Sequence, residues 1–203
     1  MKKLLFVFYL LPFICKGQDT LAVPKIPYDT ASKSYSYRII EEAPGLNKND
    51  LFYRAHEWAA LNFNSANNVI QMDDKDNGKI IIRGSYKSNY EYRMILKYNY
   101  VYYLKFVIAI TVKDSKYRVV ISDFSTQSSY NELYSNFYKS IQNKIIDVNE
   151  YNYQKKAGNE NPNITTGEAK FDLQFLNDIH VFATVTLDEI KKVLSKPAKA
   201  DDF

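Results

Sequence analysis

Residues 90–112 read YEYRMILKYNYVYYLKFVIAITV, and this stretch decides the fold. Every even-numbered position from Tyr90 to Val112 is apolar or aromatic, and this period of two is typical of a β-strand with one buried face. The odd-numbered positions are more polar and carry Glu91, Arg93 and Lys105. We therefore expect one long strand whose even face lies in the core and whose odd face is wetter.

Further strand patterns lie on both sides of this stretch. Asn77-Gly78 is a strong hairpin signal between two short apolar runs. Asp114-Ser115 predicts a second tight turn directly after the long alternation. Together with the long stretch, the predicted strands cover residues 35–42, 69–72, 79–87, 90–112 and 117–124.

Three segments have the period of a helix. Asn47 can cap a helix that runs to about residue 63, with Trp58 as its main buried anchor. A second helix is expected from Ser129, followed by a polar loop over residues 149–163. The third is expected from Thr165 to about residue 195, although its β-branched residues 180–186 leave an extended conformation open.

The N-terminus has the pattern of an export signal. Two lysines precede an apolar run of residues 4–14, which at eleven residues is shorter than the about 20 needed to span a bilayer. Cleavage after Gly17 leaves a chain without cysteine. The alternative, lipidation at Cys15, is disfavoured because the bulky Ile14 precedes it. We expect a periplasmic, surface or secreted protein.

The predicted organisation is a single domain. Residues 1–17 are the signal peptide, and residues 18–34 are a flexible linker with two prolines and no periodicity. The α+β domain covers residues 35–195, with a helical or loop insertion around residues 128–164, and residues 196–203 form a tail.

The charge balance changes once the signal is removed. Three of the 27 basic residues leave with it, so 24 remain against 23 acidic residues and the net charge falls from +4 to +1. Proteins that grip nucleic acid concentrate Lys and Arg, so a near-neutral chain argues against nucleic acid as a partner. It argues equally against a polybasic membrane patch.

Several local motifs lie between roughly residues 35 and 124: Pro44-Gly45, residues 51–58, the Asp-rich turn closing at Gly78, and residues 113–118. Together they resemble a bacterial family of secreted proteins of unknown function with a TBP-like fold. The resemblance implies a curved antiparallel sheet of about five strands, in the order β-α-β-β-β-β-α, backed by helices. It also implies a secreted or periplasmic protein of Gram-negative bacteria, and it implies no reaction.

No motif in the chain predicts a metal, a cofactor or catalysis. His56-Glu57 begins like a zinc motif, but Ala60 stands where the second histidine must be. Asp73, Asp74 and Asp76 resemble the start of a calcium loop. However, Lys75 occupies a ligand position and Gly84 stands where the closing Glu belongs. We expect a hairpin tip there, and no cofactor or metal site.

The odd face of the long strand is less polar than an ordinary exposed face, because Tyr103 and Val107 flank Lys105. Either the insertion covers this face or a partner binds there. We predict a non-catalytic binding protein of the cell envelope whose partner is a protein, peptide or glycan. Its predicted contact residues are Arg83, Tyr103, Lys105 and Val107.

One alternative from another functional class stays open. A hydrolase can assemble its acid and base from two carboxylates that only the fold brings together, and such a pair needs no local motif. Two close carboxyl groups, at least one with a shifted pKa, are the expected mark of that enzyme.

Overall fold

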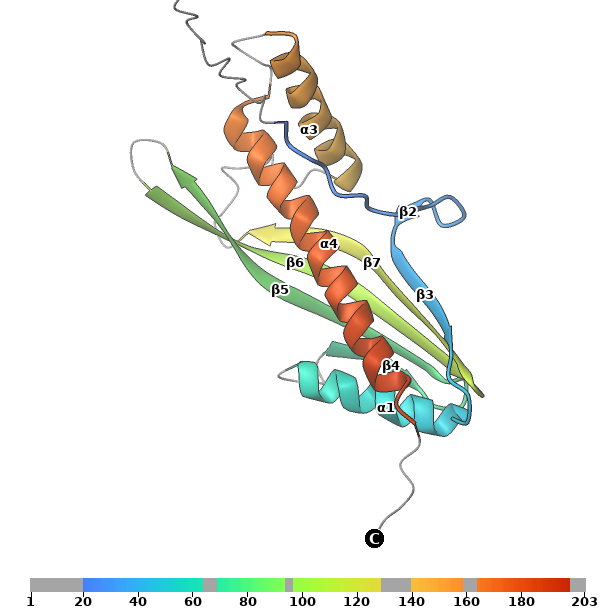
Figure 1. The fold of residues 1–203 in the computed structure, drawn as a ribbon. Coiled ribbons are helices and arrows are strands. Elements are labelled where there is room, and N and C mark those ends of the chain that lie inside the picture. Colours follow the sequence, from blue (N-terminus) through green and yellow to red (C-terminus); the bar gives the residue numbers. More distant parts are fainter. Residues whose placement is uncertain (1–19, 64–68, 94–96, 129–139, 159–163, 198–203) are drawn as a thin grey trace, which may run out of the picture.

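The computed structural model describes residues 20–63, 69–93, 97–128, 140–158 and 164–197 (Figure 1). Its centre is a five-stranded antiparallel sheet with the strand order β3-β7-β6-β5-β4. The predicted α+β fold with about five strands is therefore confirmed. The strands are β3 (Tyr37–Glu42), β4 (Ile70–Asp74), β5 (Lys79–Arg93), β6 (Lys97–Lys113) and β7 (Lys116–Ser128).

Helices lie against one face of this sheet. The long helix α4 (Thr166–Leu194) crosses the sheet, and α1 (Lys48–Asn62) packs beside its C-terminal end. The remaining helix, α3 (Ile141–Lys156), packs against α4 near the opposite end of the molecule (Figure 1). None of the helices within the described ranges is long and apolar enough to cross a membrane.

The core fills the space between the sheet and these helices. As predicted, the even positions of β6 are buried from Tyr102 to Val112, each no more than 1% exposed. Phe106 stacks on Phe182 of α4, with ring centroids 4.2 Å apart. Gly84 lies opposite Phe106, where an added Cβ would come within 2.7 Å of its ring, so a larger residue would force this packed ring to move. We call this helix-covered side the inner face.

The long alternation belongs to two strands and not to one. β5 and β6 pair antiparallel from Arg93 and Lys97 onward, so the predicted single strand over residues 90–112 is wrong. Tyr90 lies opposite Tyr100 in this pairing, and both are even-numbered. The chain thus reverses without changing which parity faces the helices, so periodicity alone could not reveal the turn.

Two predicted helices occur as expected. The side chain of Asn47 caps α1 by accepting the Asp50 backbone N–H at 2.9 Å. Thr165 and Glu168 form a reciprocal capping box at the start of α4. This helix runs unbroken through residues 180–186, which resolves the question of an extended segment in favour of helix.

The second predicted helix extends further than expected. Its predicted start at Ser129 lies outside the described residues. The described helix, α3, begins after its N-cap Ser140. It continues to Lys156, so the loop predicted from residue 149 is wrong. Val148 and Tyr151 are buried and extend the apolar stripe, while Asn152 bonds both backbone polar groups of Leu21. Burial outweighs the low helix propensity of asparagine.

The segment predicted as a flexible linker is partly structured. Its described residues form a small hairpin of β1 (Tyr28–Asp29) and β2 (Ser34–Tyr35). Ile26 is 8% exposed and belongs to the core cluster. The domain thus begins well before residue 35, because these residues supply apolar area to the core.

Candidate functional site

The side of the sheet turned away from the helices is the candidate site, and we call it the outer face. Strand pairing places Met72, Ile81, Ala109 and Val120 side by side across four strands. We call these four residues the apolar row. Met72 is 40% exposed, and the other three are half-buried. Ile40 of β3, which is 56% exposed, lies diagonally beside the row.

The four predicted contact residues all lie on the outer face. Arg83 and Val107 are directly paired between β5 and β6, and Lys105 and Tyr103 follow along β6 on the same side. Arg83 and Lys105 are exposed, whereas Tyr103 and Val107 are half-buried. The fold therefore brings the four together, and their role in contacting a partner stays a prediction.

Other residues of this face were missed from the sequence. Lys79 and Lys87 of β5 and Arg118 of β7 lie on it, as does the apolar row. Each of these residues alternates with the buried positions of its strand, which the sequence shows. Only the pairing register shows that they share one surface.

The outer face is strongly basic. The strand pairing places three acidic side chains on it, Glu42, Asp74 and Glu91, and a fourth, Asp123, is exposed at the bulge of β7. It places eight basic side chains there, an excess of at least four positive charges: Arg38, Lys79, Arg83, Lys87, Lys105, Lys113, Lys116 and Arg118. The near-neutral net charge expected after signal cleavage thus hides a marked segregation of charge between the surfaces.

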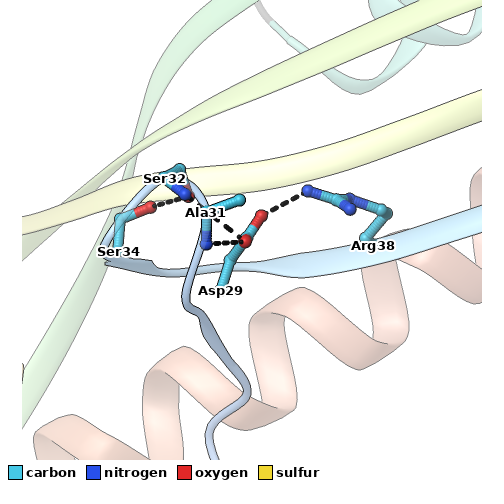
Figure 2. Close-up of polar contacts among 5 residues, drawn as sticks. All are labelled: Asp29, Ala31, Ser32, Ser34 and Arg38. Atoms are coloured by element: carbon cyan, nitrogen blue, oxygen red, sulfur yellow. Dashed lines mark hydrogen bonds and ion pairs between the residues drawn. The ribbon is translucent and has the colours of Figure 1, made fainter.

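Two of these eight cations are neutralised. Lys116 pairs with Glu42 at 3.0 Å, across the β3–β7 ladder. Arg38 pairs with Asp29 of the small hairpin, as Figure 2 shows. A third, Lys79, lies opposite Asp74, and its charge adds to the Asn77 hydrogen bonds that lower the pKa of that carboxyl. For the other five, no ion pair is found within the described part of the chain.

The carboxylate that neutralises Arg38 is fixed by its own turn (Figure 2). Asp29 accepts the backbone N–H of Ala31 at 2.9 Å and that of Ser32 at 3.4 Å. These backbone hydrogen bonds, together with the Arg38 charge, hold the pKa of Asp29 below its ordinary value. The Asp29 carboxylate that pairs with Arg38 is therefore ionised at neutral pH.

The inner face holds polar groups of a different kind. The Tyr37 hydroxyl meets His180 Nδ1 at 2.9 Å, and burial raises the pKa of Tyr37 to about 12. Asp178 accepts hydrogen bonds from Tyr102 and from Ser88, the latter at 2.6 Å. Burial, and then the Asp178 bond, raise the pKa of Tyr102. Each contact ties α4 to the sheet, and we assign them a structural role.

A buried ion pair joins α3 to α4. Lys144 Nζ lies 2.5 Å from Asp172 Oδ1, and the two side chains are 0% and 4% exposed. The ammonium also lies over the rings of Phe171 and Phe175, about 5 Å from each centroid. Desolvated charges of this kind need one another, so the pair fixes how α3 docks.

The residues weighed for metal binding make local polar contacts. His56 Nε2 meets Asp73 Oδ2 at 3.1 Å on the surface. Asp74 accepts the side chain and backbone N–H of Asn77 at the hairpin tip, and these bonds lower the pKa of its carboxyl. Among the residues described, no group of three or more potential ligands could hold a metal ion. A carboxyl group that acts as a general acid needs a raised pKa, so the lowered pKa of Asp74 does not fit that role.

Comparison with known proteins confirms the predicted resemblance. Residues 37–127 match the family described as a domain of unknown function (DUF4468) with TBP-like fold. The matched segment contains all five strands of the sheet and α1, and therefore the whole outer face described above. The sequence matches none of the curated proteins with which it was compared.

Two solved structures are similar to this chain. One is a DUF4468 family protein from Bacteroides ovatus, with 14% sequence identity and a TM-score of 0.54 over 86% of this chain and 92% of that chain. The other, a TBP-like protein from Parabacteroides distasonis, has 18% identity and a TM-score of 0.46 over 83% of this chain and 98% of that chain. At 14% identity the first similarity establishes the fold alone.

Proposed function

We propose that the protein is an exported, non-catalytic binding module of the bacterial cell envelope, and that its partner docks on the outer face of the sheet. The apolar row carries this proposal. Four apolar side chains lie in register across a sheet face on which no described helix packs, since α1 and α4 contact the inner face. Exposed contiguous apolar surface of this kind marks interaction sites.

The described part of the insertion supports the binding interpretation over the covering one. α3 packs on α4, and α4 lies on the inner side of the sheet. The other insertion residues, 129–139 and 159–163, lie outside the described residues. The alternative hydrolase needs a carboxyl group with a raised pKa. The shifted carboxyl groups, Asp29 and Asp74, do not supply one, because hydrogen bonds in their turns lower the pKa of each.

Photo-crosslinking in intact cells tests the proposal. We replace Tyr103 with the photoreactive p-benzoylphenylalanine, irradiate the cells and identify the adduct by mass spectrometry. The matched control places the same group at Tyr153 of α3, which is 71% exposed and far from the outer face. We expect one defined adduct from position 103 and none from position 153.

A double variant checks the captured partner with purified components. Tyr103→Ala with Lys105→Ala should weaken binding of that partner at least about tenfold, while the melting temperature stays within a few degrees of the parent. Equal adducts at both positions, or no adduct at position 103, would contradict the proposal. A large loss of stability in the double variant would mean that the face is core.

The proposed export is tested separately. The intact mass of the protein recovered from the envelope should correspond to a chain beginning at Gln18. A mass that instead includes Cys15 and acyl chains would establish the lipidated alternative. A full-length mass in the cytoplasm would contradict export.

A further inference from the structure

We infer that the partner of the outer face is an acidic polypeptide surface, one with apolar side chains at its centre and carboxylates around them. The inference rests on the proposed function and specifies the chemistry of the partner. Two features of the outer face carry it: the distribution of its cations and the position of its apolar row.

The cations surround the apolar row instead of mixing with it. Directly beyond the row along β5 lie Arg83 on one side and Lys79 on the other. On β7, Arg118 is two residues from Val120, and on β6, Lys113 is four residues from Ala109. An apolar centre within a polar rim is the usual anatomy of a protein–protein interface. Here cations outnumber carboxylates in the rim, although Asp74 lies beside Lys79 near Met72, so the complementary rim is mainly acidic.

The size of the surface suits such a partner. Five strands about 4.8 Å apart, over about ten residues at 3.3 Å each, cover roughly 800 Å². This is close to the area that each protein contributes to an interface of standard size.

The face is poorly suited to a second copy of this chain. In a two-fold symmetric dimer the same patch meets itself, so its excess of cations would face an equal excess on the other copy. Like charges brought together in this way disfavour association. The occupant must therefore differ in charge from the face.

A glycan fits the same residues less well than a polypeptide does. Sugar sites commonly use aromatic platforms beside amide and carboxylate groups that bond hydroxyls. The only aromatic side chain described on the outer face is Tyr103, and the apolar row consists of aliphatic side chains. Aliphatic surface of this kind packs best against aliphatic side chains of a protein.

Two labelled peptides of twenty residues test the inference by fluorescence anisotropy. One is glutamate with leucine at every fourth position, and the other has serine in place of each leucine. We expect both to bind the whole domain at low ionic strength, the leucine peptide at least about threefold more tightly. Raising the salt from 50 to 300 mM should weaken both at least about fivefold, because exposed charges are screened.

Matched variants locate the binding. Charge reversal at Arg83, Lys105 and Arg118 to Glu should weaken the leucine peptide at least about twentyfold. Reversal of the exposed helix lysines Lys156, Lys170 and Lys192 to Glu changes the net charge equally and should weaken it less than about threefold, because these charges lie on α3 and α4. Ile81→Thr with Val120→Thr should remove the preference for leucine over serine. Melting temperatures establish that each variant is folded.

Four outcomes would overturn the inference. The first two are that neither peptide binds, or that the two charge-reversal variants lose equal affinity. The third is that polygalacturonate or a 20-base-pair DNA duplex binds as tightly as the leucine peptide or more tightly. The fourth is that a peptide of residues 129–139 of this chain displaces the leucine peptide. If the peptides fail while crosslinking at position 103 succeeds, the binding function stands and only the acidic partner is wrong. If both fail, the proposed function falls as well.

Discussion

The two faces of the sheet differ in the burial and the charge of their side chains. On β6, Phe106 points to the inner face and is 1% exposed, while its neighbours Lys105 and Val107 point to the outer face. The inner face is filled with large apolar side chains packed on α1 and α4. The outer face combines small apolar groups with unneutralised cations. Adjacent residues of one strand can thus be compared directly, one buried in the core and the other on the face proposed to bind a partner.

Truncation of the inner face should have the largest effect. Phe106→Ala should lower the free energy of unfolding by about 3–5 kcal/mol, because it removes the ring that stacks on Phe182 and leaves a cavity. Val107→Ala, the neighbouring change on the outer face, should cost less than about 1 kcal/mol. Urea unfolding of both variants measures the difference. Equal losses would show that the outer face is packed as a core.

The lysines extend the comparison to charge. Lys144→Met should destabilise the protein by about 3 kcal/mol, because it removes the cation that meets the buried Asp172 carboxylate. Methionine keeps contact with the rings of Phe171 and Phe175, so the loss should lie at the low end for a broken buried pair. Lys105→Met on the outer face should leave stability nearly unchanged, as followed by urea unfolding.

A second substitution separates charge burial from packing. Adding Asp172→Leu to Lys144→Met should restore most of the lost stability, since no unpaired charge then remains. A double variant as unstable as the single one would mean that shape, and not charge, fixes α3 on α4.

Much of the inner face could be predicted from the sequence, and the site only in part. Strand parity identified the buried positions, and capping residues fixed the starts of α1 and α4. Parity also placed Tyr103, Lys105 and Val107 on the wet side of β6. The chain reversal after Arg93 was missed because even residues face the helices on both β5 and β6.

The basic character of the outer face could not be obtained from composition. Its cations come from β3, β5, β6 and β7, and a net charge summed along the chain cancels them against carboxylates on the helices and turns. Arg118 reaches the surface that carries Arg83 only because β7 and β5 flank β6 in a particular register. Register over such sequence distances is a tertiary property, whereas parity is a local one.

Alkaline pH should act on the inner face through its tyrosines. The pKa of Tyr37 is raised from its ordinary value of 10 to about 12 by burial, so the folded chain keeps a proton that the unfolded chain loses. This contribution to stability is fully present below pH 10 and is lost as the pH rises toward 12. Tyr102 acts in the same direction, because burial and Asp178 raise its pKa.

Tyr37→Phe should therefore make the loss of stability between pH 9 and pH 11 less steep, as measured by urea unfolding at several pH values. At pH 7 the variant should be less stable by about 1 kcal/mol, because the hydrogen bond to His180 is lost. Tyr153→Phe removes a hydroxyl from an exposed side chain and should leave the slope unchanged. Parallel curves for the parent and Tyr37→Phe would contradict this assignment.

The smallest loss of stability among the variants that break a described contact should come from Asp29, which pairs with Arg38. Asp29→Asn keeps an oxygen that can accept the Ala31 and Ser32 backbone N–H groups but removes the charge that neutralises Arg38 (Figure 2). The melting temperature should fall by less than in Phe106→Ala, Lys144→Met or Tyr37→Phe. Because the native pKa of Asp29 is lowered, its stabilising contribution is present above pH 4 and lost as the pH falls.

Asp29→Asn also leaves Arg38 without its carboxylate beside the apolar row, so the leucine peptide should bind about 1.5–2 times more tightly. Asp188→Asn on α4 makes an equal change in net charge and should leave that affinity unchanged, since residue 188 is exposed on the helix layer. If the two variants bind the peptide equally, the peptide responds to the total charge of the protein and not to the outer face.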